Sequence, residues 1–119
     1  MKRVAGTCLA FWAVLAASQI ALAQSAPPGD AARGRETFRQ VGCWECHGTS
    51  GEGGGWQGPR IAPRPLPWAA FNEQLRRPRS QMPPYHEDVL SSAEAADIYA
   101  YLSAVPAARP AGEIPQLSH

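Results

Sequence analysis

Lysine and cysteine are both scarce in this chain. The only lysine is Lys2, and the cysteines are Cys8, Cys43 and Cys46. The 11 basic residues nearly balance the 10 acidic ones, so the charge gives no indication of nucleic-acid binding or of a polybasic membrane contact. So few cysteines also provide no framework of several disulfides, although small domains usually need some such staple.

The first 23 residues have the pattern of a secretory signal peptide. Lys2 and Arg3 precede an apolar run over 4–20, and small residues follow at Ala21 and Ala23. The alternative is a retained membrane anchor, but the run is shorter than the ~20 apolar residues that a membrane span prefers. We therefore expect cleavage after Ala23, export to the periplasm, and no membrane span in the mature protein.

Cleavage would leave 96 of the 119 residues, enough for one small domain. Nine arginines would then face ten acidic residues, a formal charge of −1. We predict a flexible lead-in over 24–29, a folded domain over 30–106 and a disordered tail over 107–119, which contains prolines and few apolar residues. No internal repeat is present.

The motif Cys43-Trp44-Glu45-Cys46-His47 indicates covalent attachment of one haem c. Each thiol can add to one vinyl group of the porphyrin, and the adjacent imidazole can then bind the iron. A bound haem would also supply interior that so short a chain lacks.

Cys43 and Cys46 allow two other interpretations. A thiol–disulfide redox centre is usually found between a strand and a helix, and no such context is apparent. A zinc site would need further ligands from His47, His86 and His119, and the adjacent Cys46 and His47 would crowd one tetrahedron.

Capping and proline patterns predict three helices. Asp30 can cap a helix that extends to Val41, Pro67 can open a short helix that ends before Pro78, and Ser91 can begin a last helix that Pro106 stops. Between the first two helices lies a glycine-rich stretch, 48–59. We expect it to form a compact loop around the haem edge, the alternative being a flexible solvent loop.

The chain resembles the small class I c-type cytochromes over about residues 30–105. The resemblance depends on the haem motif together with Gly34-x3-Phe38, Gly58-Pro59 and Met82-Pro83 in the expected order. It implies an all-α cytochrome c fold of three to four helices around one covalently bound haem. It also implies that the first and last helices cross closely, with Gly34 and Phe38 against Ile98 and Tyr101.

The resemblance further assigns the haem ligands. Cys43 and Cys46 would form the thioethers, His47 would be the proximal ligand, and the carbonyl of Pro59 would accept a hydrogen bond from its imidazole. Met82 would be the distal ligand, a soft donor that raises the reduction potential. His86 is the rival distal ligand, and Met82 would then only fill space near the haem.

Arginine and tryptophan side chains are the candidates for holding the haem propionates, because guanidinium and indole groups suit carboxylates at a partly buried edge. The candidates are Arg60, Arg64, Trp56 and Trp68. Three arginines, Arg76, Arg77 and Arg79, precede residues 81–85, the methionine segment that contains Met82. They could form a patch for an acidic redox partner, or simply a solvated face.

These features predict a periplasmic monohaem electron carrier with transient redox protein partners. Transfer would be outer-sphere, with no small-molecule substrate and no enzymatic activity. Two alternatives stay open: a haem enzyme or ligand-binding module with a labile distal site, and a cytochrome subunit of a larger dehydrogenase or oxidase complex.

Overall fold

The computed structural model describes residues 25–54 and 58–116. The predicted signal peptide, residues 1–23, lies outside these ranges, and so do Trp56 and the last three residues of the predicted tail. Within the described part of the chain, no helix is long and apolar enough to cross a membrane.

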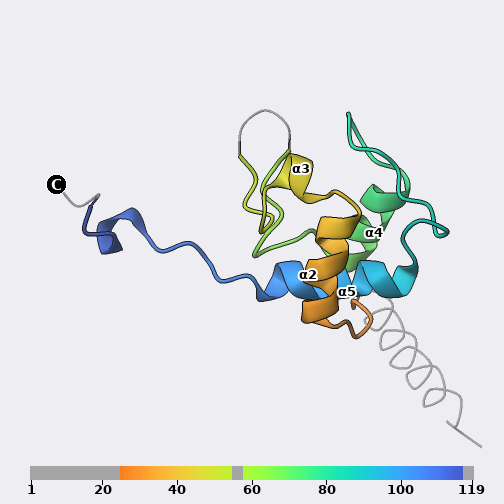
Figure 1. The fold of residues 1–119 in the computed structure, drawn as a ribbon, viewed down its shortest axis with the longest axis horizontal. Helices are drawn as coiled ribbons and strands as arrows, with labels where there is room; N and C mark the ends of the chain where they lie inside the picture. The colour runs from red at the N-terminus through yellow and green to blue at the C-terminus, as the bar shows by residue number, and fades with distance from the viewer. Residues whose placement is uncertain (1–24, 55–57, 117–119) are drawn as a thin grey trace, which may run out of the picture.

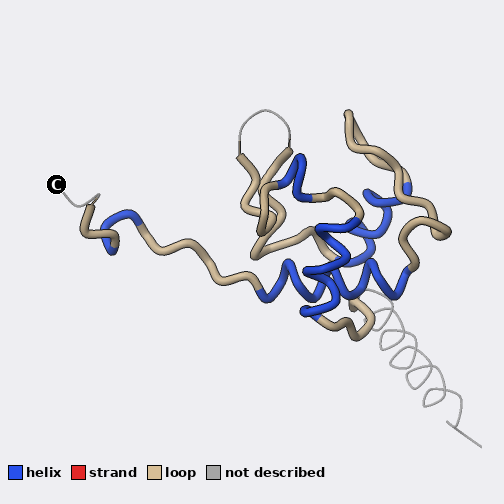
Figure 2. The backbone as a smooth tube through the Cα atoms, viewed as in Figure 1, coloured by secondary structure: helices blue, strands red, loops and turns tan. Residues whose placement is uncertain are grey.

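The described residues form four α-helices and one 3-10 turn, with no strand (Figures 1 and 2). This confirms the predicted all-α class and the number of helices. The elements are α2 (Ala31–Gln40), α3 (Trp44–His47), α4 (Trp68–Arg76), α5 (Ser92–Ala104) and η1 (Ala111–Glu113).

The helices begin where the capping patterns placed them. The side chain of Asp30 accepts a hydrogen bond from Arg33 N at 2.9 Å, which satisfies one free N–H at the start of α2. Ser91 and Glu94 form a reciprocal capping box at the start of α5. Helix α4 follows Pro67 directly. Helix α3, a single turn inside the haem motif, was not predicted.

Helices α2 and α5 cross in close contact at Gly34, with no room between their backbones for a side chain (Figure 1). A Cβ on Gly34 would overlap the carbonyl of Asp97 and lie 2.8 Å from Ile98 N. One turn further along, the rings of Phe38 and Tyr101 pack with their centroids 5.6 Å apart. The close crossing implied by the family resemblance is therefore present, and it explains a glycine in mid-helix.

A buried carboxylate holds the same crossing from α5. Asp97, only 6% exposed, accepts hydrogen bonds from Asp30 N at 2.6 Å and from Arg33 Nε at 2.9 Å. The Arg33 side chain and the Asp30 N–H lower the pKa of Asp97 below its usual value. This link ties the start of α2 to the middle of α5.

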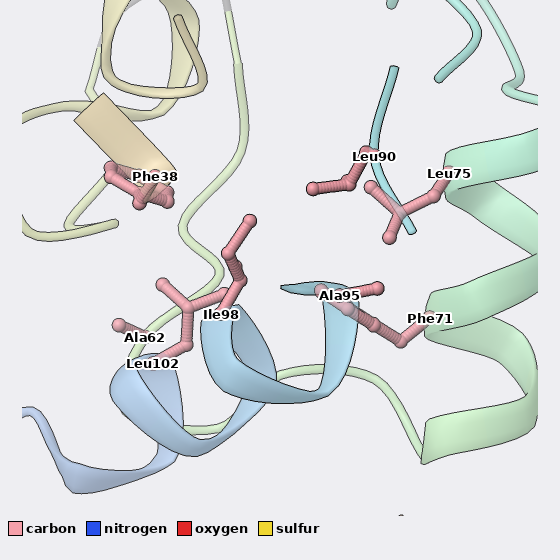
Figure 3. Packing of buried hydrophobic residues seen from close by; sticks show 8 residues of the cluster. All are labelled: Phe38, Ala62, Phe71, Leu75, Leu90, Ala95, Ile98 and Leu102. Atoms are coloured by element: carbon pink, nitrogen blue, oxygen red, sulfur yellow. The ribbon is translucent and has the colours of Figure 1, made fainter. Parts of the chain in front are cut away.

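The apolar core lies where α2, α4 and α5 converge (Figure 3). Helix α5 provides Ala95, Ile98 and Leu102, all of which are almost fully buried. The other members are Phe38 from α2, Phe71 and Leu75 from α4, and Ala62 and Leu90 from the connecting segments. Helical spacing on three elements thus aims one set of side chains at a common centre.

Beyond α5, residues 107–116 extend away from the helices, with η1 as their only regular element in the part that is described (Figures 1 and 2). The disorder expected for this tail stays a prediction.

We predict that Gly34→Ala destabilises the protein by about 1–3 kcal/mol, because the added methyl group overpacks a backbone–backbone contact. Alanine's higher helix propensity, worth about 1 kcal/mol, would stabilise an unconstrained helix instead. Urea unfolding measures the difference. Gly112→Ala is the control, since nothing lies within 4 Å of a Cβ there. Equal stability of the two variants would contradict the close crossing.

We predict that Asp97→Asn lowers stability by about 1–3 kcal/mol at neutral pH, since it weakens the charge-assisted hydrogen bonds that Arg33 and Asp30 N donate to a buried carboxylate. The folded pKa of Asp97 lies below the ordinary 3.8, so its contribution is fully present above about pH 5. It is lost as the pH falls through the lowered pKa, and wild type and variant should then converge.

Unfolding curves at several pH values test this expectation for Asp97. The control is Glu73→Gln, which removes an exposed pair to Arg77 at 3.5 Å and should change little. A stability gap between wild type and Asp97→Asn that stayed constant down to pH 2 would show that the carboxylate charge is not the cause.

Candidate haem site

The haem motif follows directly from α2. Gly42, with φ +80°, turns the chain, and Cys43 N donates to Phe38 O at 3.1 Å. Cys43 packs against the core just before the single turn of α3, and Cys46 within that turn is exposed. The backbone of α2 thus fixes where the motif begins.

The imidazole of His47 is oriented by a backbone carbonyl. Its Nδ1 lies 2.8 Å from Pro59 O. Because a carbonyl can only accept, this contact holds the proton on Nδ1 and leaves the Nε2 lone pair available to a metal. Gly58 permits the approach, since a Cβ there would lie 2.5 Å from Cys46 O and 3.1 Å from Nδ1. The contact implied by the resemblance is present.

The loop after His47 is held by its own hydrogen bonds. The carboxylate of Glu52 accepts from the backbone N–H groups of Thr49 and Ser50, and hydrogen bonds to backbone N–H lower its pKa. Gly51 O accepts from Ile61 N at 2.8 Å. The described part of this loop therefore has the compact structure that was expected, rather than that of a flexible solvent loop.

His47 and Met82 line the same apolar cavity, together with Cys43. The remaining lining residues are Phe38, Ile61, Leu66, Phe71, Gln74, Leu75, Ile98 and Leu102. Five of these, Phe38, Phe71, Leu75, Ile98 and Leu102, also belong to the core cluster. A nitrogen donor, a thioether and a thiol around an apolar space are the donor set and the surroundings that a covalent haem needs.

Two hydrogen bonds of Tyr85 tie the segment that contains Met82 to α4 and to the end of α2, just before the haem motif. Tyr85 N donates to Leu75 O at 2.8 Å, and Tyr85 Oη donates to Val41 O at 2.9 Å. Burial, followed by the neighbouring Cys43, raises the pKa of Tyr85 to about 12, so this phenol keeps its proton at physiological pH. Met82 itself is half-buried and packs on the core.

His86, the rival distal ligand, is exposed and does not line the cavity. Its backbone carbonyl accepts from Val89 N and Leu90 N, which places it in the turn beyond the methionine. The geometry therefore favours the thioether of Met82 over the imidazole of His86.

The two other readings of the cysteines gain no support from the structure. Burial raises the pKa of the Cys43 thiol to about 11, whereas a redox-active cysteine needs a lowered pKa. Among the described residues, no group of three or more His, Cys, Asp or Glu side chains is placed to hold a metal ion such as zinc.

Among the described residues, the predicted propionate ligands make no contact with one another. Arg60 is exposed, and its Nε donates to Glu52 O at 3.1 Å; Arg64 is also exposed. Trp68 packs edge-on against Tyr99, with ring centroids 5.5 Å apart. Trp56 lies outside the described residues. Their role toward propionates stays a prediction.

The three arginines before the methionine segment differ in their surroundings. Arg76 is largely buried and is occupied within the fold: Nη1 donates to Tyr85 O and Leu90 O, both at 2.7 Å, and Nη2 lies 3.0 Å from Glu87. Arg77 pairs loosely with Glu73 on the surface. Arg76 therefore fixes the segment that contains Met82, and of the three arginines only Arg77 and Arg79 are exposed. A role of these two in binding a redox partner stays a prediction.

Sequence reasoning missed Gln74, Arg76 and Asp97 as residues that shape the site. Gln74 follows Phe71 by three positions and precedes Leu75, so helical spacing could have placed it on the cavity face of α4. Asp97 and Arg76 act through contacts with residues far along the chain or in an irregular loop, and no local pattern signals such contacts.

A comparison with protein-family models matches residues 29–102 to the family described as "Cytochrome C oxidase, cbb3-type, subunit III". Neither the curated proteins nor the solved structures gave a match. The family match covers more than half of the chain and includes the haem motif, the α2–α5 crossing and Met82. The chain therefore belongs to this family of c-type cytochrome domains and is an electron-transfer haem protein.

Proposed function

We propose that this protein is an exported, monohaem carrier of single electrons, with His47 and Met82 as the axial ligands of its iron. Cys43 and Cys46 hold the porphyrin through thioether bonds. The observation that supports this proposal most strongly is the shared apolar cavity, which His47, Met82 and Cys43 all line.

The haem would supply a one-electron ferric/ferrous couple, and the protein's own residues set the conditions for it. Pro59 O keeps the proton of His47 on Nδ1. Met82 offers a soft donor, which favours the ferrous form and raises the potential. Aliphatic and aromatic side chains around both ligands keep water out of the cavity.

A carrier fits the cavity better than an enzyme does. Apart from the two proposed haem-binding residues Cys43 and His47, the lining contains no titratable side chain. No acid or base is therefore at hand to transfer protons to a bound substrate. Outer-sphere transfer needs none, so transient contacts with redox proteins suffice.

A permanent place in a larger complex is the second candidate. The matched family is described as a subunit of an oxidase, which favours a lasting partner over a transient one. Co-purification from periplasm at high salt would distinguish the two, because a transient electrostatic contact is lost there.

We predict that Met82→Ala abolishes the weak near-infrared absorption of a methionine–ferric bond and allows carbon monoxide to bind the ferrous protein. A pyridine haemochrome assay should still report covalent haem c, because the thioethers are unchanged. The matched control is His86→Ala, which should keep the absorption band and exclude carbon monoxide.

Two outcomes would contradict this ligation. Rapid carbon monoxide binding by the wild type would indicate an open distal site and favour the ligand-binding alternative. Absence of the band in the wild type, with carbon monoxide binding to His86→Ala but not to Met82→Ala, would assign the distal position to histidine.

A further inference from the structure

The side chain of Gln74 makes a hydrogen bond to the sulfur of Met82. Its Nε2 lies 3.6 Å from Met82 Sδ, a normal separation for a nitrogen donor and a sulfur acceptor. Both side chains are half-buried and line the cavity that His47 also lines. Within the described residues, this is the only hydrogen bond of the Gln74 side chain.

Burying the side-chain amide of Gln74 on the cavity wall costs free energy, because the amide loses hydrogen bonds to water. The residues around it on the cavity wall are mostly aliphatic or aromatic, and an apolar side chain of similar size would need no hydrogen-bonding partner. A thioether is only a weak acceptor, so the contact does little for stability. Its effect is expected at the sulfur atom instead.

The geometry of the pair is fixed from both sides. Gln74 lies in α4, and the next residue, Leu75, accepts the hydrogen bond from Tyr85 N. Arg76 joins α4 to the same segment through the carbonyls of Tyr85 and Leu90. The segment that contains Met82 is therefore fastened to the helix turn that presents the amide.

We propose that Gln74 is a positioning residue that orients the sulfur of Met82 and raises the reduction potential. The inference rests on the proposed function, in which Met82 binds the iron. A thioether sulfur has two lone pairs, and the Gln74 N–H engages one, which leaves the other for the metal. The hydrogen bond withdraws electron density from sulfur, so the ferric form is stabilised less than the ferrous form.

The test is Gln74→Leu in the haem-loaded protein, with Gln40→Leu as the matched control. Gln40 bonds Glu36 on the exposed face of α2 and does not line the cavity. Spectroelectrochemical titration should show the one-electron equilibrium constant shifted at least about threefold toward the oxidised form, ~28 mV at 59 mV per tenfold. The near-infrared band should persist, and Gln40→Leu should match the wild type.

A potential equal to the wild type's, with the band retained, would overturn the inference while leaving the proposed ligation intact. Absence of the band in the wild type itself would instead overturn the ligation, and the inference with it. If Gln74→Leu does not fold, Gln74→Asn replaces it, because the shorter side chain withdraws the amide from the sulfur. It should lower the potential in the same direction, and no change would again overturn the inference.

Discussion

The contact between the backbones of α2 and α5 at Gly34 is the constraint on which the rest of the molecule depends. Helix α2 leads directly into the haem motif, and α5 supplies Ile98 and Leu102 to the cavity wall. The distance between these helices therefore sets the position of Cys43 and His47 relative to that wall. Asp97 reinforces the crossing electrostatically where Gly34 permits it sterically.

The core and the haem cavity are largely the same set of side chains. Phe38, Leu75 and Ile98, for example, contact other core residues on one side and line the cavity on the other. A domain of this size buries little apolar surface by itself. Attachment of a large apolar cofactor at that place would couple haem binding to folding, as binding to the native state always stabilises it.

The two faces of the cavity are organised differently. On the side of His47, one carbonyl, Pro59 O, orients the ligand at short range. On the side of Met82, an irregular segment is fastened by Tyr85 and Arg76 to α4 and to the end of α2. Proline-rich backbone lacks hydrogen bonds of its own, so these side chains provide the rigidity that a helix would otherwise give.

Local patterns in the sequence determined the positions of α2, α4 and α5 and the attachment chemistry. The caps at Asp30 and Ser91 and the proline before α4 involve neighbours within four residues, so the sequence alone locates them. The haem motif is likewise contiguous. The conclusions about Gly34, Pro59 and Met82 needed the family resemblance in addition, because their partners lie far along the chain.

Only the tertiary structure decided which distant groups meet. His86 lies outside the cavity in the folded protein. The guanidinium of Arg76 binds the backbone carbonyl of Tyr85 at the end of the methionine segment, and the amide of Gln74 contacts the sulfur of Met82. The contacts of Arg76 and Gln74 do not follow from spacing, since both join α4 to an irregular segment whose path depends on packing. Sequence encodes local geometry directly, whereas contacts between elements appear only once the core has fixed their relative positions.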